Sequence, residues 1–170
     1  MPKSNPYTVS NFDRKDKDHY ATIDERCVVA INRAWHIPLP CIDICHNGSP
    51  TPLRPAVNGH WRDLIGPARS VLTNPPYKLP DCDDIVSQLI NAVRDNVIEM
   101  CAILVRVQWD NAKRRAPYFK FPFAGSVQLQ FRPIWFKDDH RAAPIHSYQW
   151  LVWDNRHRGK PIIEYHNGLE

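Results

Sequence analysis

The segment that most restricts the fold is residues 70–80, which read SVLTNPPYKLP. Its first residues, including Val71, Leu72 and Thr73, favour an extended strand. Two consecutive prolines then fix two φ angles and remove two backbone hydrogen-bond donors, so neither strand nor helix can continue through them. A strand is therefore expected to end at Asn74, where a stiff turn leads into the next element.

Two segments have helical periodicity. In residues 21–35 apolar side chains recur at spacings of three and four, and Thr22 with Glu25 forms a capping box at the start. The clearest helix is residues 81–100, which begins with aspartates and carries one apolar stripe. The stripe consists of Ile85, Leu89, Ala92, Val93 and Val97.

Five segments have the composition of strands. Residues 39–45 and 69–73 are short β-rich runs, and residues 101–109 form a longer apolar run typical of a buried strand. Residues 126–136 and 147–154 alternate apolar with polar side chains, which predicts an antiparallel pair. The order of elements predicts an α/β sheet, mostly parallel in its middle, with an antiparallel edge pair.

Length and composition suggest one domain. A chain of 170 residues is expected to form a single domain, here residues 20–165, preceded by a polar N-terminal arm at residues 1–19. No apolar run reaches the ~20 residues of a membrane helix. The N-terminus lacks the apolar core of a signal peptide, so a cytoplasmic location, in the host cell if the chain is phage-encoded, is expected.

The five cysteines are interpreted as buried, reduced thiols. The nearest approach to a metal-binding pattern is CIDICH, which spans Cys41 and Cys45. Because no second ligand pair stands at zinc-like spacing, no metal site is expected.

Residues 74–77 occupy a position where function is expected. In open α/β sheets reactive groups gather beyond the carboxyl ends of the strands. Two prolines leave carbonyl oxygens with no neighbouring donors, Asn74 adds a side-chain carbonyl, and Tyr77 adds an aromatic face. Together these groups suit a planar ring that carries an exocyclic amine.

A strand that ends in Asn-Pro-Pro-Tyr resembles the catalytic motif of AdoMet-dependent amino-methyltransferases, above all the DNA adenine-N6 methyltransferases. The wider chain resembles a small phage- and prophage-encoded branch of that family through residues 13–38, 72–77 and 147–161. This resemblance covers most of residues 13–165. It implies a Rossmann-like methyltransferase sheet, with S-adenosyl-L-methionine (AdoMet) as cofactor and DNA as partner.

The resemblance assigns roles to the motif Asn74, Pro75, Pro76 and Tyr77. The Asn74 side chain and the Pro75 carbonyl would accept hydrogen bonds from the amine of adenine, and Tyr77 would stack on the base. The target base must leave the duplex, which costs a few kcal/mol, and one aromatic stack worth about 1–3 kcal/mol offsets much of that cost.

The resemblance also implies cofactor contacts. Asp43 matches the acidic position after the first strand, Asn47 and Gly48 match the turn that follows, and Asp63 matches the carboxylate that reads the cofactor's adenine. Residues Tyr20 and Thr22 match the N-terminal segment of the cofactor site, although a helix cap explains Thr22 equally well. The chain departs from the family because no Asp or Glu stands between Asp43 and Asp63, so the cofactor region is expected to be reduced.

A basic segment follows the strand at residues 101–109. If that strand is parallel to its neighbour, the segment emerges at the same sheet edge as Asn74. The candidate DNA contacts are Arg114 and Arg115 for phosphates and Tyr118 and Phe119 for stacking beside the target base. The alternative is a solvated loop over packed aromatic side chains. Trp150 and Trp153 are expected in the core or at its edge.

The leading hypothesis is therefore a DNA adenine-N6 methyltransferase of phage type, which would mark DNA against restriction. A second hypothesis is a catalytically decayed member of the fold that binds DNA or acts as an anti-defence protein. A third is a methyltransferase that acts on an amide or amine in RNA or protein.

Overall fold

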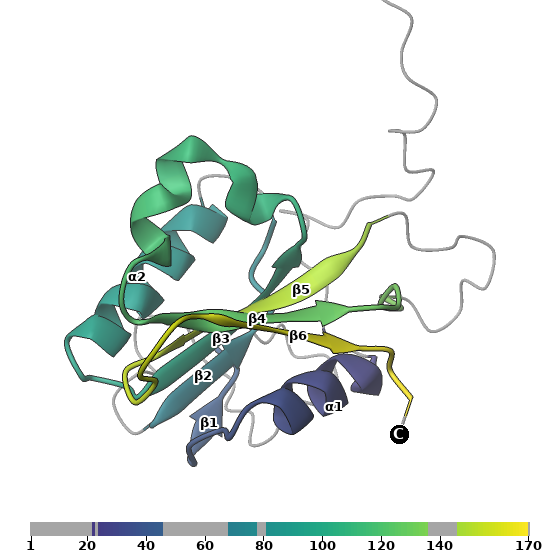
Figure 1. Ribbon diagram of the computed structural model, residues 1–170, viewed down its shortest axis with the longest axis horizontal. Coiled ribbons are helices and arrows are strands. Elements are labelled where there is room, and N and C mark those ends of the chain that lie inside the picture. The colour runs from purple at the N-terminus through teal and green to yellow at the C-terminus, as the bar shows by residue number, and fades with distance from the viewer. Residues whose placement is uncertain (1–21, 23, 46–67, 78–80, 136–145, 170) are drawn as a thin grey trace, which may run out of the picture.

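The structure, a computed structural model, describes residues 22, 24–45, 68–77, 81–135 and 146–169 (Figure 1). In chain order the elements are α1 (Glu25–Ala34), β1 (Cys41–Ile42), β2 (Ser70–Thr73), α2 (Asp81–Arg94), β3 (Met100–Arg106), the 3₁₀ helices η2 (Trp109–Asn111) and η3 (Lys113–Phe119), β4 (Phe123–Leu129), β5 (Tyr148–Asp154) and β6 (Ile162–His166).

The strands form one six-stranded sheet in the order β1-β2-β3-β5-β4-β6. Strands β1, β2 and β3 are parallel, β5 is antiparallel to both of its neighbours, and β6 is parallel to β4. The α/β class and the predicted antiparallel pairing are confirmed. The prediction that this pair forms the edge is wrong, because β6, which the sequence analysis missed, adds to β4 and encloses the pair.

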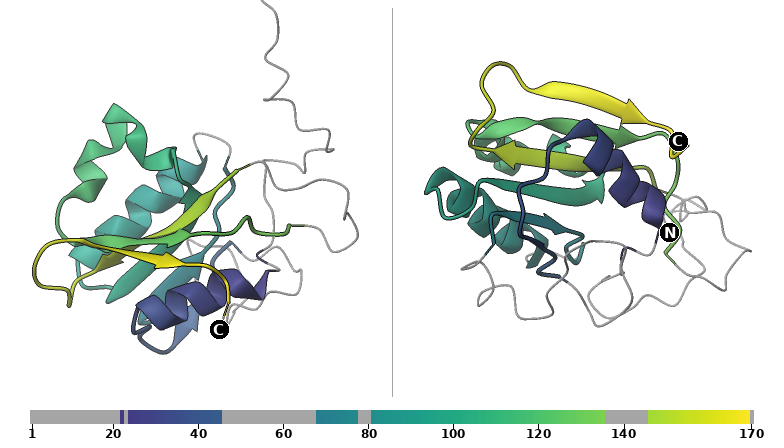
Figure 2. Two further views of the ribbon diagram at one scale, coloured as in Figure 1. Left: turned by 45° about the vertical axis from the view of Figure 1, so that its right-hand side comes forward. Right: turned by 90° about the horizontal axis from the view of Figure 1, so that it is seen from below.

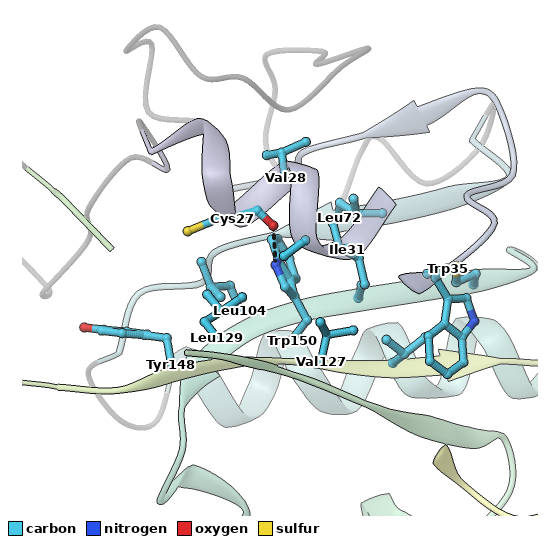
Figure 3. Close-up of a cluster of buried hydrophobic side chains, with 14 of the residues drawn as sticks. Cys27, Val28, Ile31, Trp35, Leu72, Leu104, Val127, Leu129, Tyr148 and Trp150 are labelled. Carbon is cyan, nitrogen blue, oxygen red and sulfur yellow. Dashed lines mark hydrogen bonds between the residues drawn. The ribbon is translucent and has the colours of Figure 1, made fainter. Parts of the chain in front are cut away.

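One helix covers each face of the sheet (Figures 1 and 2). Helix α1 contributes Cys27, Ala30 and Ile31 to the core on one face, and α2 packs against the other face. Figure 3 shows the α1 side, where the indole Nε1 of Trp150 donates a hydrogen bond of 2.8 Å to the Cys27 carbonyl. Trp150 and Trp153 are both fully buried, as predicted.

Helix α1 begins later than the capping box predicts. Asp24, not Thr22, is the N-cap, and its carboxylate accepts from the backbone N–H of Arg26. The same carboxylate binds the Arg26 guanidinium at 2.7 Å and the Ile134 N–H at 2.9 Å. A carboxylate can satisfy all three donors at once, whereas a threonine hydroxyl cannot, which explains why Asp24 takes the cap.

Helix α2 is shorter than predicted. The stripe residues Leu89 and Val93 are fully buried, but the helix ends at Arg94 and Val97 is 56% exposed. Asn96 adopts a left-handed backbone with φ of 58°, which stops the helix and turns the chain toward β3. The apolar periodicity therefore predicts about one helical turn more than the structure contains.

The strand ends also differ from the expected ranges. Strand β1 contains only two residues, β3 ends at Arg106, and β4 runs from Phe123 to Leu129 and not to residue 136. The alternation beyond Leu129 does not mark a strand, because Gln130 donates the last bond of the ladder, to the His166 carbonyl, before the chain leaves the sheet.

Helix α1 leads directly back into β1 and lies across the sheet opposite in direction to it (Figure 2). Its N-terminus therefore lies at the edge where β1, β2 and β3 end. The first residue of β5, Tyr148, pairs with Arg106 at the end of β3, so β5 begins at this same edge. We call this end of the strands the carboxyl edge of the sheet, as distinct from its two outermost strands, β1 and β6.

Candidate functional site at the carboxyl edge of the sheet

The Asn-Pro-Pro-Tyr motif lies immediately after β2, whose neighbours β1 and β3 end at the same edge. Asn74 is 3% exposed, Pro75 and Pro76 are buried, and Tyr77 is half-buried. The motif, residues 74–77, is therefore a buried segment at the end of β2 and not a surface turn, which is the position that the sequence predicts for it. We call this segment the lip.

A side-chain hydrogen bond joins the first and last residues of the lip. The Tyr77 hydroxyl donates to the side-chain carbonyl of Asn74, three residues earlier. Burial raises the pKa of Tyr77 well above its ordinary value, so the hydroxyl stays protonated at neutral pH and acts as the donor. This bond fixes the orientation of the Asn74 amide.

The Tyr77 ring belongs to a small aromatic cluster, which we call the rim cluster: Tyr77, Tyr148 and Trp135. The Tyr77 and Tyr148 ring centres are 5.7 Å apart, and the Tyr148 and Trp135 rings meet edge to face at 5.0 Å. The guanidinium of Arg106 lies over the Tyr77 ring at 5.3 Å. A base that stacks on Tyr77 must either displace Arg106 or use a part of the ring that Arg106 leaves uncovered.

Asp43 connects the ends of β1 and β2. Its carboxylate is buried, and Oδ1 accepts from the Thr73 hydroxyl at 2.7 Å and from the Cys45 N–H at 3.1 Å. Thr73 immediately precedes Asn74, so the predicted acidic position and the motif share one corner of the carboxyl edge. These two bonds show that Asp43 also holds the turn after β1.

The cysteines near this corner are buried thiols. All five cysteines of the chain are free, and every one except the half-buried Cys45 is buried. Burial raises the pKa of Cys45 and of Cys82 to about 12. The predicted burial of the thiols is confirmed for four of them, and Cys82 lies in α2, within the predicted helix.

The two arginines of the basic segment have different environments. Arg114 has a side chain 56% exposed and reaches Asp83 at 2.9 Å. Arg115 is buried; it binds the other oxygen of Asp83 at 2.9 Å, donates to the Trp109 carbonyl, and lies 4.2 Å over the Trp109 ring. Arg114 can meet a phosphate as it stands, whereas Arg115 would have to leave these partners first.

Tyr118 and Phe119 pack on other aromatic side chains. The Tyr118 carbonyl accepts from Trp153 Nε1 at 2.7 Å, and Phe119 packs edge to face on Phe123 at 5.0 Å. The Tyr118 ring stacks on Trp109, 6.2 Å away and just beyond the end of β3, whereas Phe119 lies near Trp153, which pairs with Cys101 toward the start of β3. Both rings are half-buried among these partners, as in the alternative of a loop over packed aromatic side chains, and stacking beside the target base stays a prediction.

Several predicted site residues fall outside the described part of the chain. Tyr20, Asn47, Gly48 and Asp63 are among them, as are the arm at residues 1–19 and the reduced cofactor region between β1 and β2. Thr22 is described and is buried, just before α1. Of the cofactor contacts that the resemblance implies, the structure therefore places Thr22 and Asp43 only.

Sequence reasoning missed the partners of Tyr77. Arg106 is the last residue of the strand next to β2, and Tyr148 opens the strand paired with it, so both follow from the correct strand order. Trp135 had no such signal, because the strand predicted to contain it ends at Leu129.

No protein-family model matches the chain, and no curated protein sequence matches it either. Within the described ranges, none of the helices combines the length and the apolar character needed to cross a membrane.

Proposed function

We propose that the chain transfers a methyl group from AdoMet to the exocyclic amine of adenine in DNA. The observation that carries the proposal is the buried position of Asn74 at the carboxyl end of β2, with its amide oriented by Tyr77 and with Asp43 at the end of the adjacent strand. Neighbouring parallel strands that end in polar groups form the usual ligand crevice of α/β sheets.

The described residues fit a cofactor at this corner. Asp43 and Thr22 are the described residues that would hold AdoMet, and Asp43 supplies a buried carboxylate beside the motif. When bound, AdoMet would supply an electrophilic methyl group on a sulfonium centre. Because the sequence has no Asp or Glu between Asp43 and Asp63, cofactor affinity is expected to be weak.

The contribution of the protein is positioning. The Asn74 carbonyl and the Pro75 carbonyl would accept the two N–H bonds of the amine, which directs the nitrogen lone pair away from them and toward the methyl donor. The Tyr77 hydroxyl bond keeps the Asn74 carbonyl turned toward the motif. The amine loses its proton after methyl transfer, so a strong general base is not required.

Arg114 supports contact with DNA. It is exposed, it follows β3 at the carboxyl edge, and it already lies beside the first turn of α2 through Asp83. A phosphate contact there would contribute affinity that falls as the salt concentration rises. The described residues include no separate segment that could read the bases of a DNA sequence, which is consistent with weak sequence preference.

One observation favours a second function, a catalytically inactive protein that binds DNA. The groups expected to receive the base already satisfy each other, because Tyr77 bonds Asn74 and Arg106 covers part of the Tyr77 ring. If these contacts persist when DNA binds, the lip has no room for a base.

The test is methyl transfer from isotopically labelled AdoMet to duplex DNA, single-stranded DNA, RNA and a protein mixture, with nucleoside analysis of the product. Label in N6-methyladenine that drops at least about a hundred-fold in Asn74→Ala supports the proposal, since misplacing a reacting group costs that much. Asn91→Ala, at an exposed site on α2, is the matched control and keeps full activity.

The other outcomes are distinct. Label that enters RNA or protein and not DNA would replace adenine in DNA as the substrate. DNA binding that weakens with salt, without AdoMet binding by calorimetry, supports the inactive DNA-binding protein. Tyr77→Phe separates the two roles of Tyr77, because it removes the bond to Asn74 but keeps the ring; partial loss of activity is expected.

A further inference from the structure

Strand β6 forms an edge of the sheet and exposes apolar side chains. Ile162, Ile163 and Tyr165 are 43%, 62% and 64% exposed, and no described strand lies beyond β6 (Figure 2). An unpaired strand edge offers a row of backbone donors and acceptors, and apolar side chains around it make pairing with another strand more favourable.

The outward-facing backbone groups of β6 can be identified. Gln130 donates its N–H to the His166 carbonyl at 2.8 Å, so His166 directs its backbone toward β4. In a parallel ladder this direction alternates along the strand. The backbone groups of Ile162 and Glu164 therefore also face β4, and those of Ile163 and Tyr165 face away from the sheet.

The two edges of the sheet differ in their protection. Strand β1, at one edge, has only two residues, which is too short to pair strongly with another strand. Strand β6 has five residues, IIEYH, and contains neither lysine nor proline, the usual protective residues of exposed edges. Strand β6 is thus the longer and less protected of the two edge strands.

We propose that β6 pairs with β6 of a second copy of this chain, antiparallel about a two-fold axis, so that one continuous sheet runs through the dimer. Identical strands related by a two-fold axis perpendicular to them must be antiparallel, and such an interface is closed. This interface is at the far end of the sheet from β2, so the proposal does not rest on the proposed function.

Glu164 and Pro161 exclude two registers near the middle of β6. Only registers that pair outward-facing residues with each other can form the ladder. A register centred on Glu164 places Glu164 opposite its own copy, which is repulsive. One centred on Ile163 places Tyr165 opposite Pro161, which has no N–H to donate.

The register centred on Tyr165 avoids both problems. It pairs Tyr165 with its copy, and it places each Glu164 opposite the other copy's His166, on the α1 side of the sheet. The Gly168 N–H donates to Nδ1 of His166 at 3.0 Å, so the ring proton is on Nε2, from which it can be donated to the carboxylate. Side chains directly opposite in such non-hydrogen-bonded pairs approach closely.

The experiment is sedimentation velocity on the full chain over a concentration series from low to high micromolar. We expect a monomer–dimer equilibrium in the micromolar range, because a single pair of short strands is a small interface. Tyr165→Pro removes the outward-facing N–H at the axis without touching a bond to β4, and it should shift the chain to monomer. Val97→Glu, at an exposed site beyond α2, is the matched control and should leave the dimer unchanged.

A charge exchange tests the register. Glu164→Lys and His166→Glu should each weaken dimerisation about tenfold, and the double variant should restore it, because the pair is then Lys opposite Glu. A chain that is monomeric at all concentrations overturns the proposal and leaves the edge to a strand of another protein. Assemblies larger than a dimer, or a dimer that Tyr165→Pro leaves intact, would also overturn it. Circular dichroism checks that each variant stays folded.

Discussion

Arg114 and Arg115 are adjacent and identical in charge, and the structure predicts opposite consequences for replacing them with methionine. Methionine keeps an unbranched side chain and removes the charge. Arg115→Met breaks a buried ion pair with Asp83, a bond to the Trp109 carbonyl and a contact over the Trp109 ring. Arg114→Met breaks only an exposed pair with the same carboxylate.

The magnitudes follow from burial. Removing one partner of a buried pair costs about 3–5 kcal/mol, and the lower value applies because Arg114 remains beside Asp83. The exposed pair of Arg114 contributes about 0–1 kcal/mol. For a domain of this size each kcal/mol lowers the melting temperature by about 2–4 °C. Arg115→Met should therefore melt about 6–12 °C below the wild type, and Arg114→Met less than about 4 °C below it.

The assay is thermal unfolding followed by circular dichroism at low and high salt, with DNA affinity measured in parallel. High salt should abolish the small effect of Arg114→Met and leave the large effect of Arg115→Met. If Arg114 contacts a phosphate, its replacement lowers the slope of log affinity against log salt by about one. Equal melting temperatures for the two variants would refute the reasoning, because both arginines would then be surface residues.

Three further predictions concern stability and reactivity. Gly125→Ala should detach β6 and lower the melting temperature, because the new Cβ would lie 2.1 Å from the Ile162 carbonyl oxygen and Gly125 has φ of 152°. Loss of β6 should be visible as faster amide hydrogen exchange in that strand. Native thiols should react with Ellman's reagent far more slowly than in denaturant, because burial raises the pKa of Cys45 and Cys82 to about 12; rapid reaction of the native chain would contradict their burial. Burial acts to raise the pKa of Asp154, but the hydrogen bonds from Arg156 and Trp35 outweigh it, so the pKa is lowered. The ionised carboxylate therefore stabilises the folded state at pH values above its unfolded pKa of about 3.9. This contribution to the free energy of unfolding is lost as pH falls through the folded pKa. Asp154→Asn should flatten the acid limb of urea stability measured against pH, and an unchanged limb would show that Asp154 does not contribute.

The local pattern of the sequence was sufficient for several elements. The strand before Asn74, the burial of Leu89 and Val93, and the pairing of the two alternating segments all follow from periodicity and proline chemistry. These features depend on residues close together in the chain or on a simple period. For the same reason the position of the Asn-Pro-Pro-Tyr motif at a strand end could be predicted.

The ends of the helices, and the contacts between residues far apart in the chain, could not be predicted from the local sequence. The sequence predicted Thr22 as the cap and residue 100 as the end of the second helix, whereas Asp24 and Asn96 determine those ends. Asp24 takes the cap because it also binds Arg26 and the distant Ile134 N–H, a partner 110 residues away in the chain. No local window contains that partner.

The sequence by itself determined a stiff, polar lip at the end of a strand, because two prolines enforce it wherever the strand lies. Only the tertiary structure decided what surrounds the lip. It placed Arg106 over Tyr77, buried Arg115 while leaving Arg114 exposed, and packed Phe119 edge to face on Phe123. Adjacent residues with the same chemistry receive different roles because burial depends on strand order and on the direction of η3, and both are set by contacts between segments far apart in the chain.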